Sequence, residues 1–336
     1  MPITQTRYVV RAYFPTLCRW TNTRLVDAYT RPEAAARLYR KGPDAIRRHF
    51  PPQTQIPTPQ VPGISYLHLT CLGAHLVFPE DDGEPNCRSI QVESLGEAID
   101  RLERPMAFDD CFWIARYLEF GAEMERLLGE PVRRSLGKEG PVTTASLLLD
   151  RAFHEGLIVH PEQAHRILEL VVDSMVAFDR FTRRVNDEPL RGTSASIVDD
   201  LASLLSPDHW KTFVTPYWER YYSRALGNGG TRYLHVENVR TDHLPLIEAF
   251  GVDHYDPSHA PGIDPSILHA HLSRTPWQWE VQAVHVLEGR EEMRRQIARA
   301  VEYGACRLVM LIHDTVEPDD VWFFVEEAER AGAVSM

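Results

Sequence analysis

Cysteine is scarce in this chain, and long apolar runs are missing from it. The five cysteines, Cys18, Cys71, Cys87, Cys111 and Cys306, form no Cys-x-x-Cys pair. This odd, scattered set argues against a cysteine-rich zinc site and indicates reduced thiols in a cytoplasmic protein. No apolar stretch approaches the roughly 20 residues of a membrane span. The first residues also lack the charged and then apolar pattern of a signal peptide. We therefore expect a cytoplasmic protein without a membrane partner.

Positive charge is also in short supply. The chain has 36 Lys and Arg residues against 48 Asp and Glu residues, a net charge of −12. An acidic surface repels phosphate backbones, so we expect no nucleic-acid partner, although a few local arginines can still hold a small anionic substrate. The sequence contains neither G-x-G-x-x-G nor G-x-x-x-x-G-K-[ST], so dinucleotide-binding and triphosphate-binding folds lose their main support.

What the chain does contain is an alternation of apolar strands and amphipathic helices. Eight strands are predicted, at 64–71, 74–78, 132–136, 195–198, 231–236, 252–255, 279–284 and 306–312. Long helices are predicted at 111–128, 161–184 and 207–226. This alternation is typical of parallel α/β proteins, and eight strands in 336 residues favour a closed (α/β)8 TIM barrel. We predict an N-terminal helical appendage with a proline-rich linker over 1–62 and a catalytic barrel over 63–336.

A histidine and a glutamate share one face at the end of a predicted strand. His235 and Glu237 are two residues apart, so their side chains point the same way. His313 follows another apolar strand. Two histidines and one carboxylate are the smallest ligand set of a mononuclear metal site with open positions, and this ligand order occurs in many non-haem iron enzymes. We predict that these three residues bind one divalent ion, Fe(II) or Zn(II). The alternative is two hydrogen-bonded pocket histidines, with Glu237 paired to Arg240.

Four stretches of the chain follow the order of one known family. They are 140–145 (Gly-Pro-Val-Thr-Thr-Ala), 199–217 with its Asp-Asp and Ser-Pro pairs, 234–253 with its His and its Gly-Val-Asp end, and 313–321 after the last strand. In order and spacing they resemble the uroporphyrinogen decarboxylase superfamily. That superfamily includes the decarboxylase and the zinc-dependent methyltransferases that work with coenzyme M or corrinoid proteins. The resemblance covers residues 64–335 and implies an (α/β)8 barrel whose active site lies at the carboxyl ends of the strands.

Two departures from the family pattern direct the functional prediction. The decarboxylase holds substrate carboxylates with an arginine-rich N-terminal strand and loop, a pattern that Arg7, Arg11 and Arg19 do not match. The methyltransferases carry a cysteine two residues after the histidine and another at the last strand, where this chain has Glu237 and His313. A His-Glu-His centre is harder than a thiolate centre and leaves positions open for water, dioxygen or a substrate oxygen.

The other site candidates are polar or aromatic side chains near predicted strand ends. Asp199 and Glu280 are candidate catalytic acids. The ordinary alternatives are that the pair Asp199-Asp200 caps the helix that follows, with Asp200 as the better cap, and that Glu280 is a polar strand residue. The candidates for binding substrate are Arg240, Arg191, His68, Asp256 and Trp279. Arginine binds carboxylates with two parallel hydrogen bonds, although surface ion pairs are its commoner role.

We therefore expect a mononuclear metalloenzyme that acts on a small polar or carboxylated metabolite. The ligand set slightly favours oxidative Fe(II) chemistry over Zn(II). One alternative is a cofactor-free decarboxylase in which Asp199 stabilises a protonated intermediate and His313 transfers a proton. A second is a corrinoid- or thiol-linked methyltransferase, and a third is a binding barrel without chemistry. The sequence does not set the oligomeric state, and a homodimer is compatible with it.

Overall fold

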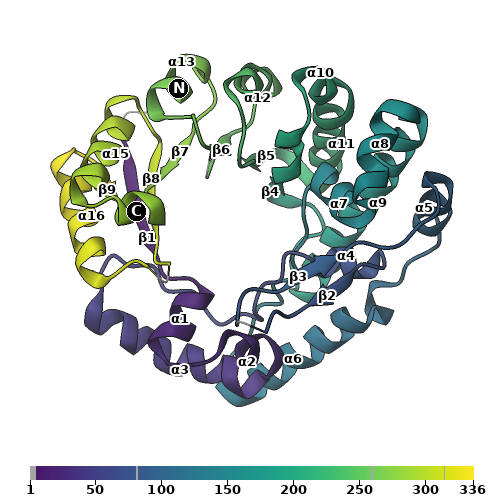
Figure 1. The fold of residues 1–336 in the computed structure, drawn as a ribbon. Helices are drawn as coiled ribbons and strands as arrows, with labels where there is room; N and C mark the ends of the chain where they lie inside the picture. The colour runs from purple at the N-terminus through teal and green to yellow at the C-terminus, as the bar shows by residue number, and fades with distance from the viewer. Residues whose placement is uncertain (1–4, 81, 259, 314) are drawn as a thin grey trace. The chain divides into compact units, whose positions relative to one another are not determined.

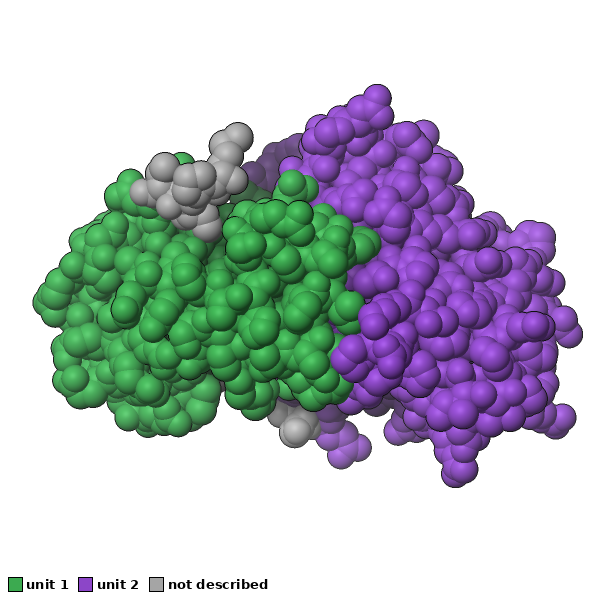
Figure 2. Space-filling view, turned by 90° about the horizontal axis from the view of Figure 1, so that it is seen from above, with its two compact units in different colours: residues 1–59, 237–336 green, residues 60–236 purple. Residues whose placement is uncertain are grey.

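The computed structural model describes residues 5–80, 82–258, 260–313 and 315–336. The chain divides into two compact units, which Figure 2 colours separately. Unit 1 combines residues 1–59 with residues 237–336, and unit 2 is the continuous stretch 60–236. Within the described ranges, no helix has both the length and the apolar character that crossing a membrane requires.

Unit 1 is built around a sheet in the order β7-β8-β1-β9, in which neighbouring strands are parallel. Its elements are β1 (Arg7–Arg11), α1 (Phe14–Trp20), α2 (Leu25–Thr30), α3 (Pro32–His49), a 3-10 turn η4 (Thr241–His243), α12 (Leu244–Phe250), β6 (His254–Asp256), α13 (Pro265–His271), β7 (Gln278–Glu280), α14 (Ala283–Leu287), α15 (Arg290–Glu302), β8 (Arg307–Leu311), α16 (Pro318–Arg330) and β9 (Val334–Ser335). Helices α15 and α16 pack against each other and against β8 (Figure 1). The strand β8 is apolar on both faces because both are covered.

The N-terminal residues of unit 1 are part of this sheet. The sequence predicts a helical appendage over 1–62, and α3 does begin at Pro32, within that range. However, β1 lies between β8 and β9, paired residue by residue with β8 from Arg7 opposite Arg307 to Arg11 opposite Leu311. Its central residues Tyr8, Val9 and Val10 are buried. Residues 7–11 therefore belong to the core of unit 1, which local sequence patterns do not reveal.

Unit 2 is rich in helices and contains two separate strand pairs. Its elements are α4 (Leu67–Cys71), β2 (His75–Val77), β3 (Asn86–Arg88), α5 (Leu95–Leu102), a 3-10 turn η1 (Phe108–Asp110), α6 (Phe112–Leu128), α7 (Pro141–Leu149), α8 (Arg151–Val159), α9 (Pro161–Val185), β4 (Gly192–Val198), a 3-10 turn η2 (Asp200–Leu204), α10 (Pro207–His209), a π-helical turn η3 (Trp210–Val214), α11 (Thr215–Ala225) and β5 (Leu226–His235). Strands β2 and β3 are antiparallel, whereas β4 and β5 are parallel. Helix α9 packs against α11 and α5 (Figure 1).

The long helices agree closely with the sequence predictions. Helices α6 and α9 lie within one residue of the predicted ranges. The hydroxyl of Ser206 accepts a hydrogen bond from the backbone N–H of His209, so Ser206 is the N-cap of the helical run that starts at Pro207. That run reaches Ala225, and the π-helical turn interrupts it.

Among the short apolar runs, 195–198 and 306–312 are the strands β4 and β8 as predicted, but others differ from the prediction. The run 64–71, predicted as a strand, is mostly the helix α4, and its strand character is limited to a bridge between Ile64 and Leu136. The predicted strand 279–284 ends early, because β7 stops at Glu280 and α14 starts at Ala283. A short buried apolar run has the same pattern in a strand and in a buried helix, so tertiary packing decides between them.

Candidate functional site

In unit 2, three backbone segments meet at the carboxyl ends of β4 and β5. Val198 and His235 are opposite each other in the parallel pair. The N–H of Asp199 donates to the carbonyl of His235 (3.0 Å), and the N–H of Gly140 donates to the carbonyl of Val198 (2.5 Å). These two hydrogen bonds hold the start of α7 next to the ends of both strands, where polar side chains then gather.

Asp199 is the buried anchor of this arrangement. Its side chain is fully buried, and its two oxygens accept hydrogen bonds from the backbone N–H of Thr143 (2.7 Å) and from Nε1 of Trp218 (2.7 Å). Burial raises the pKa of Asp199 to about 6, although these hydrogen bonds oppose the rise. The carboxylate caps the first turn of α7 and joins it to α11. This geometry makes Asp199 a positioning residue, and its predicted catalytic role stays a prediction.

Next to Asp199, a carboxylate lies close to an imidazole. Oδ1 of Asp200 is 3.5 Å from Nε2 of His235. The side chain of His235 is 19% exposed and that of Asp200 is 31% exposed, so both can be reached from solvent. The sequence singles out His235 correctly as a residue at the end of a strand. It gives Asp200 only a capping role.

Glu139 is a third acid at this place, and it is nearly buried. It is 7% exposed and directly precedes Gly140. Burial raises the pKa of Glu139 to about 8, and the negative charges of Asp200 and Asp199 add to the rise, while His235 opposes it. At neutral pH the Glu139 carboxyl is therefore mostly protonated. We call Glu139, Asp200 and His235 the unit-2 cluster.

A second group of polar side chains lies at the carboxyl ends of three neighbouring strands in unit 1. Glu280 ends β7, His313 follows β8 by two residues, and Tyr13 follows β1 by two residues. The hydroxyl of Tyr13 is 2.9 Å from Nδ1 of His313, and Oε1 of Glu280 is 3.8 Å from Nε2 of His313. The rings of Tyr13 and His313 also meet edge to face. We call Tyr13, Glu280 and His313 the unit-1 cluster.

The three predicted metal ligands belong to different units. His235 is in unit 2, whereas Glu237 and His313 are in unit 1. Over the residues that the structure describes, no three His, Cys, Asp or Glu side chains are grouped closely enough to hold a metal ion. The close pairs are instead His235 with Asp200 and His313 with Glu280. The metal triad therefore stays a prediction.

His68 differs from its predicted setting. It lies in α4 rather than at the end of a strand, and it is fully buried. Its Nε2 is hydrogen-bonded to Oγ of Ser174 (2.9 Å), and its ring packs against Phe178. Burial lowers the pKa of His68 to about 3, so the imidazole is neutral under ordinary conditions. These contacts are those of a core histidine.

Two further predicted substrate contacts are buried in unit 1. Asp256 ends β6, and its Oδ1 accepts a hydrogen bond from the N–H of Ser258 (2.9 Å). Trp279 lies in β7 and donates from Nε1 to the side-chain oxygen of Gln296 (3.1 Å). The two arginines are exposed. Arg191 makes a long contact to the carbonyl of Ser223 (3.5 Å), and Arg240 contacts Asp242 (3.3 Å) and His243 (3.1 Å).

Two members of the clusters are missing from the sequence predictions. Glu139 comes directly before the Gly140-Pro141 start of α7, so its place at a helix entry next to a predicted strand was the available signal. Tyr13 comes just after the apolar residues Tyr8 to Val10, which read as a strand only once their pairing with β8 is known. In both cases the partners come from distant parts of the chain.

Comparison with known proteins agrees with this architecture. The sequence profile of the family described as uroporphyrinogen decarboxylase (URO-D) matches residues 63–329. Among solved structures, a methyltransferase from Methanosarcina mazei is similar with a TM-score of 0.70, at 17% sequence identity, over 98% of this chain and 95% of the other. No protein with a curated description matches the sequence.

These matches show both the fold and the family of the chain. The fold is the α/β TIM barrel that this structural likeness implies. The chain belongs to the uroporphyrinogen decarboxylase family, because the match covers most of its length. Enzymes make up this superfamily, among them decarboxylases and methyltransferases.

Proposed function

We propose that this protein catalyses a decarboxylation-type reaction on a small carboxylated metabolite, with the unit-2 cluster as its proton donor. The observation that supports the proposal is the buried Glu139 carboxyl beside Asp200, with its pKa raised to about 8. A general acid works best when its pKa lies near the working pH. A carboxyl that keeps its proton at neutral pH suits that task, as in other enzymes that raise the pKa of an acid by burial.

The proposed reaction is balanced by a single proton. The carbon–carboxylate bond of the substrate breaks, carbon dioxide leaves, and the electron pair of that bond stays on carbon. The carbon then takes the proton of Glu139. The resulting Glu139 carboxylate regains a proton from solvent through the pair His235 and Asp200, which are partly exposed. Asp199 supports this step indirectly, because it holds the start of α7 that follows Glu139.

The test of the proposal uses Glu139→Gln, which preserves shape and removes the acid. The assay measures labelled carbon dioxide released from a panel of carboxyl-labelled mono- and dicarboxylic acids. We expect the variant to lose activity by about 10²- to 10⁴-fold, the usual contribution of a general acid. The matched control is Glu130→Gln, at an exposed glutamate, which should keep full activity. An active wild type with an equally active Glu139→Gln variant would refute the role of Glu139. A wild type that decarboxylates no acid in the panel would refute the reaction.

A second candidate is the metal-dependent enzyme that the sequence predicts, with His235, Glu237 and His313 as ligands. The observation that favours it is the 2.9 Å hydrogen bond between Nδ1 of His313 and the hydroxyl of Tyr13. With Nδ1–H as the donor to the hydroxyl oxygen, Nε2 keeps its lone pair for a metal. The donor set fits a divalent ion chemically, since two imidazoles and a carboxylate suit Fe(II) and Zn(II). When bound, such an ion would supply oxidative chemistry with dioxygen if it is Fe(II), or polarise a substrate oxygen if it is Zn(II).

Metal analysis separates the two candidates. The protein is purified without oxygen, its metal content is measured, and dioxygen uptake is followed. The metal enzyme would be supported if the wild type contains one equivalent of iron or zinc and if His235→Ala and His313→Ala each lose it. The control His269→Ala, on the surface of α13, should keep the metal. Full decarboxylation in the presence of a strong chelator would favour the acid mechanism and exclude the metal from that reaction.

A further inference from the structure

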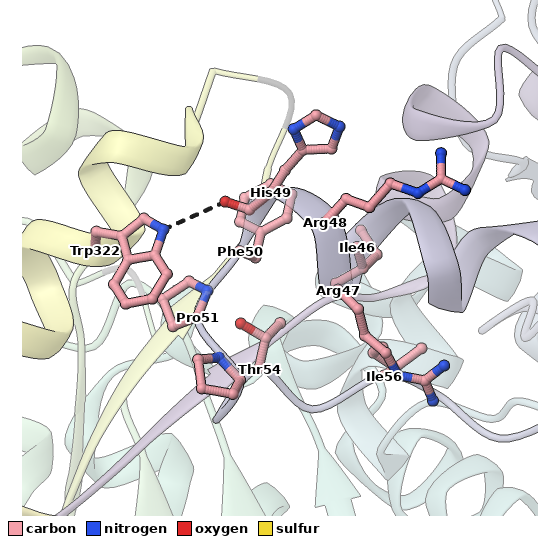
Figure 3. A pocket seen from close by; sticks show the side chains of 10 residues that line it. Ile46, Arg47, Arg48, His49, Phe50, Pro51, Thr54, Ile56 and Trp322 are labelled. Atoms are coloured by element: carbon pink, nitrogen blue, oxygen red, sulfur yellow. Dashed lines mark hydrogen bonds between the residues drawn. The ribbon is translucent and has the colours of Figure 1, made fainter.

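Unit 1 contains a pocket that is separate from both clusters. Its volume is about 740 Å³, which lies within the range of small-molecule sites. It is lined by the end of α3, by the segment that follows as far as Ile56, and by Trp322 of α16 (Figure 3). Apart from Trp322, every lining residue precedes residue 63, where the family match begins. The pocket is therefore built mainly from a part of the chain outside the family profile.

The lining of this pocket is positively charged. It includes Arg47, Arg48 and His49 and contains no acidic residue. Arg47 pairs only loosely with Asp44, at 3.4 Å between two side chains that are both 68% exposed. Within the described ranges, no carboxylate lies at ion-pair distance from Arg48. Basic residues in a last helical turn are common because they complement the helix dipole. That explains their charge, but not the cavity beside them.

A buried hydroxyl in the same lining has no partner. Thr54 is 9% exposed, and its Oγ1 makes no hydrogen bond within the described part of the protein. The backbone N–H of Thr54 donates to the carbonyl of Pro51 (2.9 Å), so only the side-chain hydroxyl lacks a hydrogen-bond partner among the described residues. A buried hydroxyl without a partner costs free energy, and a polar group that enters the pocket would recover it.

The opposite wall offers a flat aromatic surface. Trp322 is 42% exposed, and its Nε1 donates to the carbonyl of His49 (3.3 Å), which fixes the orientation of the indole. Figure 3 shows Pro51 next to the indole, and Arg47 extending toward Ile56 on the other side. An exposed tryptophan face beside a proline ring suits a planar apolar group, and arginine suits a carboxylate.

We propose that this pocket binds a small aromatic carboxylate. The ring of the ligand lies against Trp322 and Pro51. Its carboxylate binds Arg47 within the positive potential that Arg48 reinforces. Thr54 donates its hydroxyl hydrogen to a ligand oxygen. This site is independent of the proposed decarboxylation, so either proposal can fail alone.

The direct test is titration calorimetry of the full chain with 1-naphthoate. Two comparison compounds are 1-naphthylmethanol, which has the ring without the charge, and inorganic phosphate, which has the charge without the ring. We expect saturable 1:1 binding of naphthoate and at least tenfold weaker binding of the other two. The proposal would be overturned if 1-naphthoate shows no saturable binding at millimolar concentration. It would also be overturned if phosphate or 1-naphthylmethanol binds as tightly as 1-naphthoate.

Three variants place the binding in this pocket. Arg47→Gln combined with Arg48→Gln should weaken naphthoate at least tenfold, and Thr54→Val, which keeps the shape of the side chain, should weaken it several-fold. The matched control is Arg37→Gln, an exposed arginine of the same helix outside the pocket, which should bind normally. Unchanged affinity in both pocket variants would show that naphthoate binds elsewhere and would refute the site. Thr54→Val keeps the test valid if the double variant folds poorly.

Discussion

Glu139 shows what burial does to a single carboxyl group in this protein. Its pKa is about 8 instead of the ordinary value of 4.5, because burial and the neighbouring Asp200 disfavour the charged form. Between these two pH values the folded protein keeps a proton that the unfolded chain has released. The contribution of this group to stability is therefore complete below the unfolded pKa and is lost as the pH rises to about 8.

This leads to a prediction about stability at different pH values. Between about pH 5 and pH 8.5, the wild type should lose on the order of a few kcal/mol more free energy of unfolding than Glu139→Gln, which cannot ionise. Urea unfolding at several pH values measures the difference. Glu130→Gln, at an exposed position, should follow the wild type. If the free energies of unfolding of the wild type and Glu139→Gln change in parallel with pH, the pKa of the Glu139 carboxyl is not raised.

Asp199 gives a second prediction for a single residue. Its replacement by Ala leaves two buried donors, Nε1 of Trp218 and the N–H of Thr143, without an acceptor. Each unsatisfied donor costs about 1–3 kcal/mol, so Asp199→Ala should be destabilised by roughly 2–5 kcal/mol in urea unfolding. Asp199→Asn keeps one acceptor oxygen and should lose less. Asp208→Ala, at a side chain that is 91% exposed, serves as control. A loss below about 0.5 kcal/mol for Asp199→Ala would contradict the anchoring role.

Among the elements, the long periodic helices and several short strands, such as β4 and β8, could be predicted, whereas the run 64–71 could not. In helices α6 and α9 the apolar residues repeat at helical spacing within one continuous stretch of sequence, so the sequence alone reveals them. The helix α4 has five residues, too few for a period to be recognised. The candidate site follows the same division. His235 and His313 lie at or just after strand ends as predicted, whereas Glu280, predicted near the start of the strand 279–284, is the last residue of β7. Glu139 and Tyr13 acquire their partners only through tertiary pairing.

The start of α7 gives a prediction about an element. A Cβ added at Gly140 would lie 2.5 Å from Cβ and 2.6 Å from Cγ of the buried Asp199. Gly140→Ala should therefore push α7 away from the end of β4 and cost about 1–3 kcal/mol. The control is Gly227→Ala in β5, where the nearest atom is at an ordinary 3.7 Å. Thermal unfolding compares the two variants. Equal melting temperatures would mean that α7 accommodates the methyl group without strain.

At the scale of the whole molecule, unit 1 joins the two ends of the described chain. Deleting residues 1–12 removes β1, the only common neighbour of β8 and β9 in the described sheet. We expect the truncated protein to lose cooperative unfolding in circular dichroism, because Tyr8, Val9 and Val10 are buried core residues. As a control, Arg7→Gln, at the exposed first residue of β1, should leave the melting transition in place. A protein that starts at residue 13 and melts like the full chain would support the prediction that the N-terminal residues are an appendage.

The position of β1 also constrains how the polypeptide is made. This strand leaves the ribosome before its partner β8, which is translated about 300 residues later, an interval on the order of 15–60 seconds at common elongation rates. During that interval unit 2, which is continuous in the chain, can collapse on its own. The hydrophobic segment 8–10 meanwhile has no sheet to join, so nascent chains should depend on a holding chaperone until residues 237–336 emerge.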